Sequence, residues 1–182
     1  KNYIYNNLRH HSPWSNSPYT AWRCVLGVSA SHEMAKRDRP YVDKYKGRIT
    51  SAGQKYGVDP AVLGGIISRE SRGGTGLVNG SGDNGNAHGL MQVDKRYHSP
   101  KGAWDSQEHI DQGAQILAGS YSDVERKYPH WPKEKKLKGA LAAYNMGAGS
   151  ISSYEQVDAK TTGEDYSNDV VARAQYFKKH GY

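Results

Sequence analysis

One carboxylate of this sequence occupies a position suited to acid catalysis. Glu70 continues the helical spacing of Leu63 and Ile66, which places it on the apolar face of an expected helix, near the end of that helix. Burial raises the pKa of a carboxyl, and the negative end of a helix dipole acts in the same direction. A carboxyl that keeps its proton near neutral pH can serve as a general acid. The spacing leaves a second interpretation open, in which Glu70 forms an ion pair with Arg69 or Arg72.

Two further carboxylates follow Glu70 closely in the chain. Asp83 lies in a glycine-rich segment, and Asp94 comes directly after the short apolar run at 90–93. A glycosidase that inverts configuration needs an acid and, across a gap of roughly 6.5–9.5 Å, a carboxylate that activates water. Asp83 could also be a turn residue, and Asp94 could pair with Lys95 or Arg96. The residues alone do not decide which aspartate would act as the base.

Helical patterns dominate the elements that must position these groups. An N-cap is expected at Asp59, because Pro60 suits the first position of a helix. We expect helices from near Ser31 to Gly57 with a break or kink at Pro40, from Pro60 to Gly73, from Ser106 to Tyr128, from Pro132 to Gly147, and from about Asp165 to Lys179. Residues 1–26 show no clear periodicity and are expected to form an irregular arm.

The segment at 73–89 holds seven glycines, which predicts a loop or a small irregular sheet because glycine is unfavourable inside regular elements. The run at 90–93 is expected to be strand-like or buried. We therefore expect an α+β, mainly α-helical fold, with residues 1–182 forming one domain.

Composition excludes several functional classes. The formal net charge is +7 and the sequence pI is about 9.3, so polyanions should attract the protein. No run of five Lys or Arg occurs, which argues against a nucleic-acid partner. No apolar stretch approaches the ~20 residues that span a bilayer, so no membrane insertion is expected. The eight histidines lack metal-ligand spacing and no phosphate-binding loop is present, so neither a metal nor a cofactor is expected.

Several long motifs, in order, resemble goose-type lysozyme over about residues 27–182. They are IISRES at 66–71, GLMQVD at 89–94, AYNMGAG at 143–149 and NDVVARAQY at 168–176. No single motif would suffice, because Glu-Ser followed by Gly-Leu-Met-Gln is shared with lytic transglycosylases. The chain departs from the avian pattern in having one cysteine, Cys24, which excludes an intramolecular disulfide. It also has His88 where that pattern has an aromatic ring.

The resemblance implies a lysozyme-like fold with a small β-hairpin or sheet. It implies an enzyme that hydrolyses the β-1,4 bond between N-acetylmuramic acid and N-acetylglucosamine with inversion. Glu70 would be the acid, and Asp83 and Asp94 the candidates for holding water. The residues that match the sugar cleft of the family are Gln92, His98, Tyr144, Asn145 and Tyr166. The partners implied are bacterial peptidoglycan and N-acetylglucosamine oligomers, for a secreted, antibacterial and monomeric protein. No signal peptide is visible in the chain.

Three other functions compete with this interpretation. A lytic transglycosylase needs only the acid and forms anhydro-muramic ends, whereas Asp83 and Asp94 favour hydrolysis because water must be positioned. A non-catalytic cationic wall-binding protein would not depend on Glu70. Nucleic-acid binding rests on net charge alone.

The basic charge leads to a prediction about salt. High salt should weaken activity on whole bacterial cells more than activity on soluble chito-oligosaccharides, because only the anionic wall attracts the protein over long range. Rates measured on both substrates across a salt series test this. Equal salt sensitivity would count against steering by charge.

Overall fold

The computed structural model describes residues 18–182, and their side chains from residue 27 onward. Helix α1 covers Pro18–Val42, so the expected start near Ser31 is wrong. A proline at the first position of a helix is favourable, and residues 18–26 are helical although they lack an apolar stripe. The expected irregular arm is therefore shorter, and its remainder, residues 1–17, lies outside the described part of the chain. Ser31 is not an N-cap but a buried residue inside α1.

The helical stretch is interrupted shortly after Pro40, close to the break expected there. Pro40 lies in the last turn of α1, and the chain continues through the 3-10 turn η1 (Asp43–Tyr45) into α2 (Lys46–Tyr56). Helix α2 ends at Gly57, whose left-handed φ of 71° suits a residue without a Cβ. The expected end of the helical stretch at Gly57 is thus confirmed.

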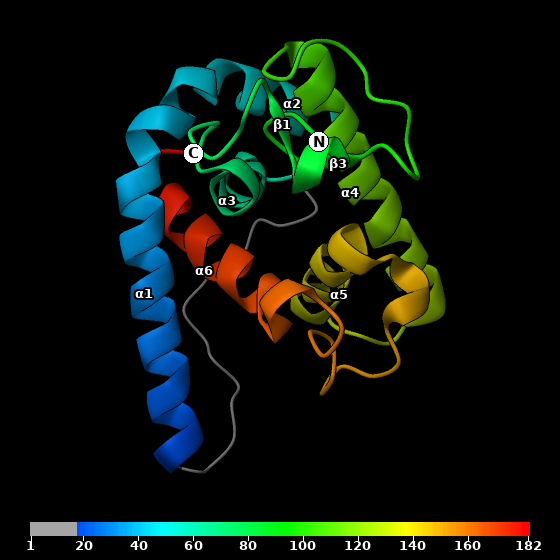
Figure 1. Ribbon diagram of the computed structural model, residues 1–182. Helices are drawn as coiled ribbons and strands as arrows, with labels where there is room; N and C mark the ends of the chain where they lie inside the picture. Colours follow the sequence, from blue (N-terminus) through cyan, green and yellow to red (C-terminus); the bar gives the residue numbers. More distant parts are fainter. Residues whose placement is uncertain (1–17) are drawn as a thin grey trace.

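Helix α3 covers Pro60–Ser71 and lies at the centre of the molecule (Figure 1). The expected N-cap is confirmed, since the Asp59 side chain accepts a hydrogen bond of 2.9 Å from the backbone N–H of Ala61. Residues 61–68 are all buried, which is typical of a helix enclosed on every side. The helix ends two residues before the glycine pair at 73–74, with Arg72 in the left-handed conformation as its C-cap.

The glycine-rich segment forms a small irregular sheet. Its three antiparallel strands are β1 (Ser81–Gly82), β2 (Ala87–His88) and β3 (Val93–Asp94), in that order. Ser81 pairs with His88, and Ala87 pairs with Asp94. The 3-10 turn η2 (Asp83–Gly85) joins the first two strands. Asp83 and Asp94 therefore belong to one small sheet and its connecting turn rather than to an extended loop.

The remaining helices follow the expected boundaries closely. They are α4 (Gln107–Lys127) with Ser106 as its N-cap, α5 (Lys133–Met146), the 3-10 turns η3 (Ala148–Ser150) and η4 (Thr162–Glu164), and α6 (Tyr166–Lys179). Helix α6 packs on both α3 and α1, and α4 packs on α2 and α5. The mainly helical α+β fold is confirmed. No described helix is long and apolar enough to cross a membrane.

Close backbone contact joins α3 to α6. A Cβ atom added at Gly65 would lie 2.9 Å from the carbonyl oxygen of Val170 and 3.1 Å from the backbone nitrogen of Ala174. Both atoms belong to the backbone of α6, so they cannot turn aside as the tip of a side chain could. The missing side chain of Gly65 therefore sets the distance between the two helices.

Substitution of this glycine tests the contact. Gly65→Ala should lower the free energy of unfolding by about 1–3 kcal/mol, because the α6 backbone must shift to admit the methyl group. The matched control is Gly119→Ala on the exposed face of α4, where no atom lies within 4 Å of the added Cβ. The control should gain roughly 0.5–1 kcal/mol from higher helix propensity. Urea unfolding of both variants measures the two effects, and a stabilised Gly65→Ala would contradict the close approach.

Candidate active site

Glu70 lies in the last turn of α3, with its side chain half-buried. Its Oε1 accepts a hydrogen bond of 2.5 Å from the hydroxyl of Tyr166, the first residue of α6. Burial raises the pKa of Glu70 to about 7, against the opposing effects of this hydrogen bond and of the Arg69 charge. The carboxyl is therefore a proton donor at and below neutral pH, as the sequence predicted from its position on the apolar face.

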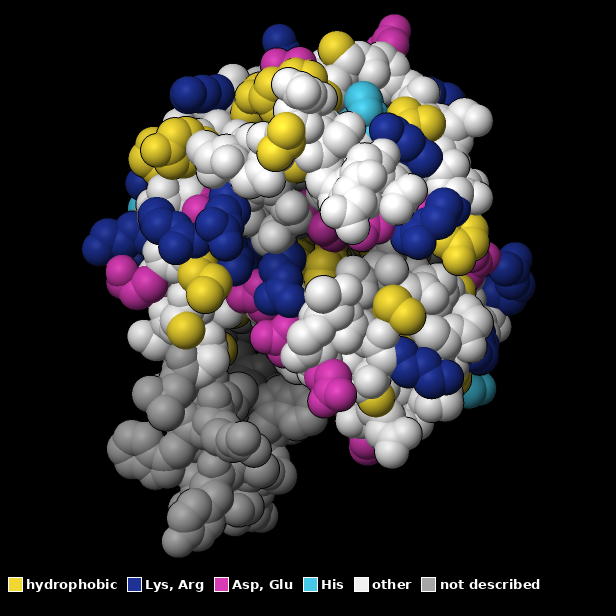
Figure 2. Space-filling view, in the orientation of Figure 1, with side chains coloured by type: hydrophobic (Ala, Val, Ile, Leu, Met, Phe, Trp, Pro, Cys, Tyr) yellow, Lys and Arg dark blue, Asp and Glu magenta, His cyan; other side chains and the backbone are white. Residues whose placement is uncertain are grey.

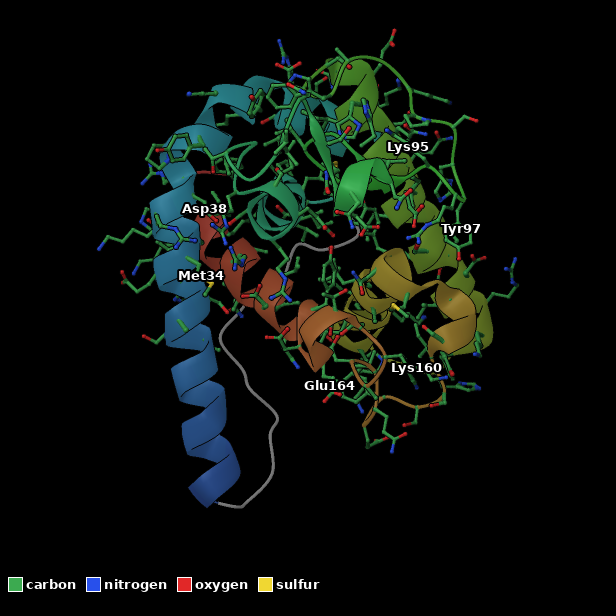
Figure 3. The ribbon with its side chains drawn as sticks, viewed as in Figure 1. Met34, Asp38, Lys95, Tyr97, Lys160 and Glu164 are labelled. Atoms are coloured by element: carbon green, nitrogen blue, oxygen red, sulfur yellow. The ribbon has the colours of Figure 1, made fainter. Side chains whose placement is uncertain are left out.

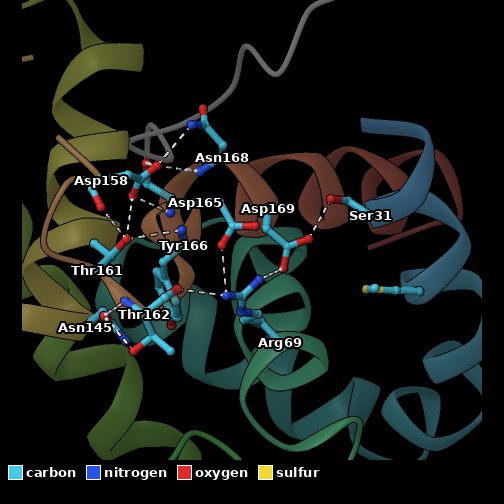
Figure 4. A network of polar contacts seen from close by, with 12 residues as sticks. Ser31, Arg69, Asn145, Asp158, Thr161, Thr162, Asp165, Tyr166, Asn168 and Asp169 are labelled. Atoms are coloured by element: carbon cyan, nitrogen blue, oxygen red, sulfur yellow. Dashed lines mark hydrogen bonds and ion pairs between the residues drawn. The ribbon is translucent and has the colours of Figure 1, made fainter. Parts of the chain in front are cut away.

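The alternative in which Glu70 forms an ion pair is not what the structure shows. Within the described residues, Glu70 has no salt bridge. Arg69 turns away from it to Asp165 and Asp169 at the start of α6 (Figure 4), and Arg72 is an exposed C-cap residue. Glu70 is thus a half-buried carboxyl without a salt-bridge partner among the described residues, and these conditions favour its neutral form.

Two tyrosines enclose this carboxyl. Tyr166 of α6 is 1% exposed, and its hydroxyl donates to the Glu70 carboxyl. Tyr144, in the last turn of α5, is half-buried. Burial first, and the nearby charge of Glu70 second, hold the pKa of both hydroxyls well above their ordinary value. Both tyrosines are therefore neutral hydrogen-bond donors next to the acid.

The peptide unit of Met91 connects the acid to the sheet. Its carbonyl oxygen accepts a hydrogen bond of 2.7 Å from the Tyr144 hydroxyl. Its N–H donates to Nε2 of His109, a buried residue in the first turn of α4, at 3.0 Å. Burial lowers the pKa of His109 to about 4, so the ring is neutral and can accept this bond. Gln92 follows with a left-handed φ of 49°, and its Nε2 donates to the Gly89 carbonyl at 2.8 Å.

Asp83 and Asp94 are brought together by one arginine. Arg96 Nη2 lies 2.7 Å from Asp94 Oδ2 and 3.5 Å from Asp83 Oδ2. Asp94 also receives the Arg96 Nε–H at 2.9 Å on its other oxygen, and this pairing lowers the pKa of Asp94. The side chain of Asp83 is 54% exposed. The interpretation of Asp94 as an Arg96 partner is therefore confirmed, and both aspartates lie at the same end of the sheet.

A hollow crosses this face of the molecule, with acidic side chains along it (Figure 2). In the matching view with side chains, Lys95 lies above the hollow, Tyr97 lies to its right, and Lys160 and Glu164 lie below it (Figure 3). The exposed His98 follows Tyr97, and the two line a shallow pocket beside α4. The hollow is thus bounded by the sheet on one side and by the loop before α6 on the other.

Asn145 and His88 make specific contacts at the borders of this region. Asn145 Oδ1 accepts the Thr162 N–H at 3.0 Å, which ties the end of α5 to η4. His88 packs edge-on against His109, with ring centroids 5.2 Å apart, and its Nε2 lies 3.2 Å from the Gly102 carbonyl. Among the described residues no group of His, Cys, Asp and Glu could hold a metal ion.

Comparison with known proteins agrees with these features. A family model described as Lysozyme g matches residues 13–181. The lysozyme G of Dromaius novaehollandiae is 55% identical over 156 residues, which are 86% of this chain and 76% of that protein. The lysozyme g of Gallus gallus is 53% identical over 156 residues, 86% of this chain and 74% of that protein. The chain belongs to the lysozyme g family.

The family also includes more distant relatives. The Homo sapiens lysozyme g-like protein 2 is 38% identical over 156 residues, 86% of this chain and 71% of that protein. Membership in the lysozyme g family makes the chain a lysozyme-type glycoside hydrolase. The resemblance inferred from the motifs is therefore confirmed.

Sequence reasoning missed three features of the candidate site. Tyr166 was expected to line the sugar cleft, and the structure adds a bond to Glu70 that its position 96 residues away did not suggest. Arg96 was considered for Asp94 alone, although it also reaches Asp83. The contact of His109 with the Met91 peptide left no local signal in the sequence.

The raised pKa of Glu70 predicts how its removal affects stability. The folded-state value of about 7 lies above the ordinary 4.5, so the protonated carboxyl contributes stability below pH 4.5 that is lost as pH rises to 7. Glu70→Gln cannot lose a proton. Between pH 4.5 and 8 its free energy of unfolding should therefore improve relative to the unchanged protein by about 3 kcal/mol.

Chemical unfolding at several pH values measures this difference. The matched control is Glu155→Gln, which removes an exposed carboxyl and should leave the pH dependence unaltered. Parallel stability curves for Glu70→Gln and the unchanged protein would show that Glu70 titrates normally in the folded state.

Proposed function

We propose that the chain hydrolyses the β-1,4 bond between N-acetylmuramic acid and N-acetylglucosamine in bacterial peptidoglycan, with inversion, and that Glu70 is the general acid. The observation that carries this proposal is the half-buried Glu70, whose pKa of about 7 keeps a proton on the carboxyl. In the reaction Glu70 gives this proton to the glycosidic oxygen as the bond to the sugar breaks. Activity should accordingly fall as pH rises through about 7, because the ionised carboxylate has no proton to give.

A second carboxylate activates the water that attacks the sugar from the opposite face. Asp83 and Asp94 are the two candidates, and their pairing with Arg96 distinguishes them. Both oxygens of Asp94 accept hydrogen bonds from Arg96, which lowers its pKa and its basicity. Asp83 is more exposed and keeps one oxygen without an Arg96 contact. Asp83 is therefore the better candidate for the base, with Asp94 holding Arg96 and helping to orient the water.

The sugar chain would occupy the hollow between the sheet and the loop before α6. Gln92, Tyr144 and Asn145 are half-buried, and His98 is exposed, so these side chains can reach a ligand. Tyr166 is buried and would contribute mainly through Glu70. Peptidoglycan and N-acetylglucosamine oligomers are the proposed ligands. We further propose a secreted, antibacterial monomer in which residues 1–182 form one catalytic domain.

Three variants test the assignment of the carboxylates. Glu70→Gln should lower the rate of clearing of a bacterial suspension at least about a hundredfold, the size of a general-acid contribution. Asp83→Asn should lose more activity than Asp94→Asn, because Asp83 is the proposed base. Glu155→Gln, far less enclosed than Glu70, is the control that should retain full activity.

Product analysis separates the proposal from its competitors. Mass spectrometry of digested peptidoglycan should show reducing muramic ends with one added water. Anhydro-muramic ends as the main product would identify a lytic transglycosylase. Bacterial killing that survives Glu70→Gln in full would identify a non-catalytic wall-binding protein.

A further inference from the structure

Arg69 is bound to three groups at the start of α6. Its Nη1 lies 2.6 Å from Asp169 Oδ2. Its Nη2 lies 3.0 Å from Asp165 Oδ1 and donates to the Thr162 carbonyl at 3.0 Å. The side chain of Arg69 is only 21% exposed, so these contacts are made in a partly desolvated setting where charged hydrogen bonds are strong.

These contacts surround Tyr166 (Figure 4). Thr162 and Asp165 precede Tyr166 in the chain, and Asp169 follows it by about one turn of α6. The guanidinium carbon of Arg69 also lies 5.7 Å from the centre of the Tyr166 ring, which is within the range of a cation–π contact. The residue next to Glu70 in the sequence therefore contacts the ring of the tyrosine that donates to Glu70 from another helix.

We propose that Arg69 is a positioning residue that keeps the Tyr166 hydroxyl on Oε1 of Glu70. The proposal rests on the proposed function, because it assigns Arg69 a role through the acid. Two consecutive residues of α3 thus have complementary roles, since Glu70 holds the reacting proton and Arg69 fixes the donor that accompanies it.

A purely structural role for Arg69 would require that its contacts are needed to hold the start of α6 in place. The start of α6 is already fixed by other bonds, such as those that the buried Asp158 accepts from Ser167. Arg173 also bridges Asp169 and Asp38 in the interior. The contacts peculiar to Arg69 are those that bracket Tyr166. The planar guanidinium makes them together, whereas a lysine ammonium is a point charge that cannot hold this forked arrangement.

The consequence is expressed in the titration of Glu70. The charged or titratable groups that face Glu70 are Tyr166 from α6, Tyr144 from α5 and Arg69 from its own helix. The hydrogen bond from Tyr166 stabilises the carboxylate and so lowers the pKa of Glu70. A displaced Tyr166 hydroxyl would let this pKa rise and would extend the protonated form of the acid to higher pH.

Arg69→Lys separates this effect from charge, because it keeps the positive charge and removes the fork. The pKa of Glu70, followed by carbon-13 NMR of its carboxyl, should rise by about half a pH unit or more. The alkaline limb of the pH–activity profile should move with it. Turnover of soluble chito-oligosaccharides below that limb should fall about tenfold, because the acid is less well oriented, while KM changes little.

A double variant tests whether Arg69 acts through Tyr166. Tyr166→Phe should raise the pKa of Glu70 in the same direction, and adding Arg69→Lys should then shift it no further. Arg72→Gln, which removes an exposed charge two residues from Glu70, is the matched control and should leave the pKa and the profile unchanged. Asp165→Asn is a second, milder probe that weakens one of the Arg69 contacts and should shift the pKa in the same direction.

Two results would overturn the inference. An unchanged pKa and alkaline limb in Arg69→Lys, with only a lower melting temperature, would assign Arg69 a structural role. Fully additive pKa shifts in the double variant would show that Arg69 acts on Glu70 without Tyr166. The NMR titration needs no catalysis, so these results are distinguishable from failure of the proposed function, which full activity of Glu70→Gln would reveal.

Discussion

The contact between α3 and α6 is the constraint on which the site depends. Gly65 permits the two backbones to approach, and the buried side chains of Asp38, Ser68, Arg173 and Asp169 join them further along. At the end of this seam α3 presents Glu70 and α6 presents Tyr166. Because the helices cannot separate without breaking both apolar and ionic contacts, the carboxyl keeps its enclosed position. Packing in the core thus sets the buried environment that raises the pKa of Glu70.

The two sides of the hollow provide opposite electrostatic environments. On the α3 side, burial outweighs a hydrogen bond and a nearby positive charge, and the carboxyl of Glu70 retains its proton. On the sheet side, Arg96 forms a forked pair with Asp94, and the carboxylate form is favoured. Carboxyl groups whose pKa values are pushed apart in this way hold different charges at the same pH. The difference between the pKa values of Glu70 and Asp94 follows from solvent exposure and from the position of Arg96, since both groups are carboxyls.

Local signals in the sequence predicted much of this arrangement. The position of Glu70 on a helix face and the cap formed by Asp59 before Pro60 are both encoded within a few residues. Signals of this kind did not predict the start of α1 at Pro18, because residues 19–25 include several weak helix formers and show no clear apolar periodicity. They also suggested Ser31 as a cap, whereas its hydroxyl donates to Asp169, 138 residues away. Local signals could not predict the contacts of Arg69 and Tyr166 either. They join residues 96 and 100 positions apart, and such pairs are fixed by tertiary packing. The family motifs suggested candidate site residues, but they did not reveal which of these residues touch one another.

The peptide unit of Met91 helps to fix the position of the sheet beside the hollow. Its two polar ends are held by different helices, the N–H by His109 of α4 and the carbonyl by Tyr144 of α5. These two bonds fix the part of the sheet that carries Asp94 relative to the helices. Its position therefore does not depend on the glycine-rich turns alone. The position of Asp94 relative to Glu70 is thus set by the helices. The position of Asp83, at the start of the exposed turn at 83–86, depends on the conformation of that turn.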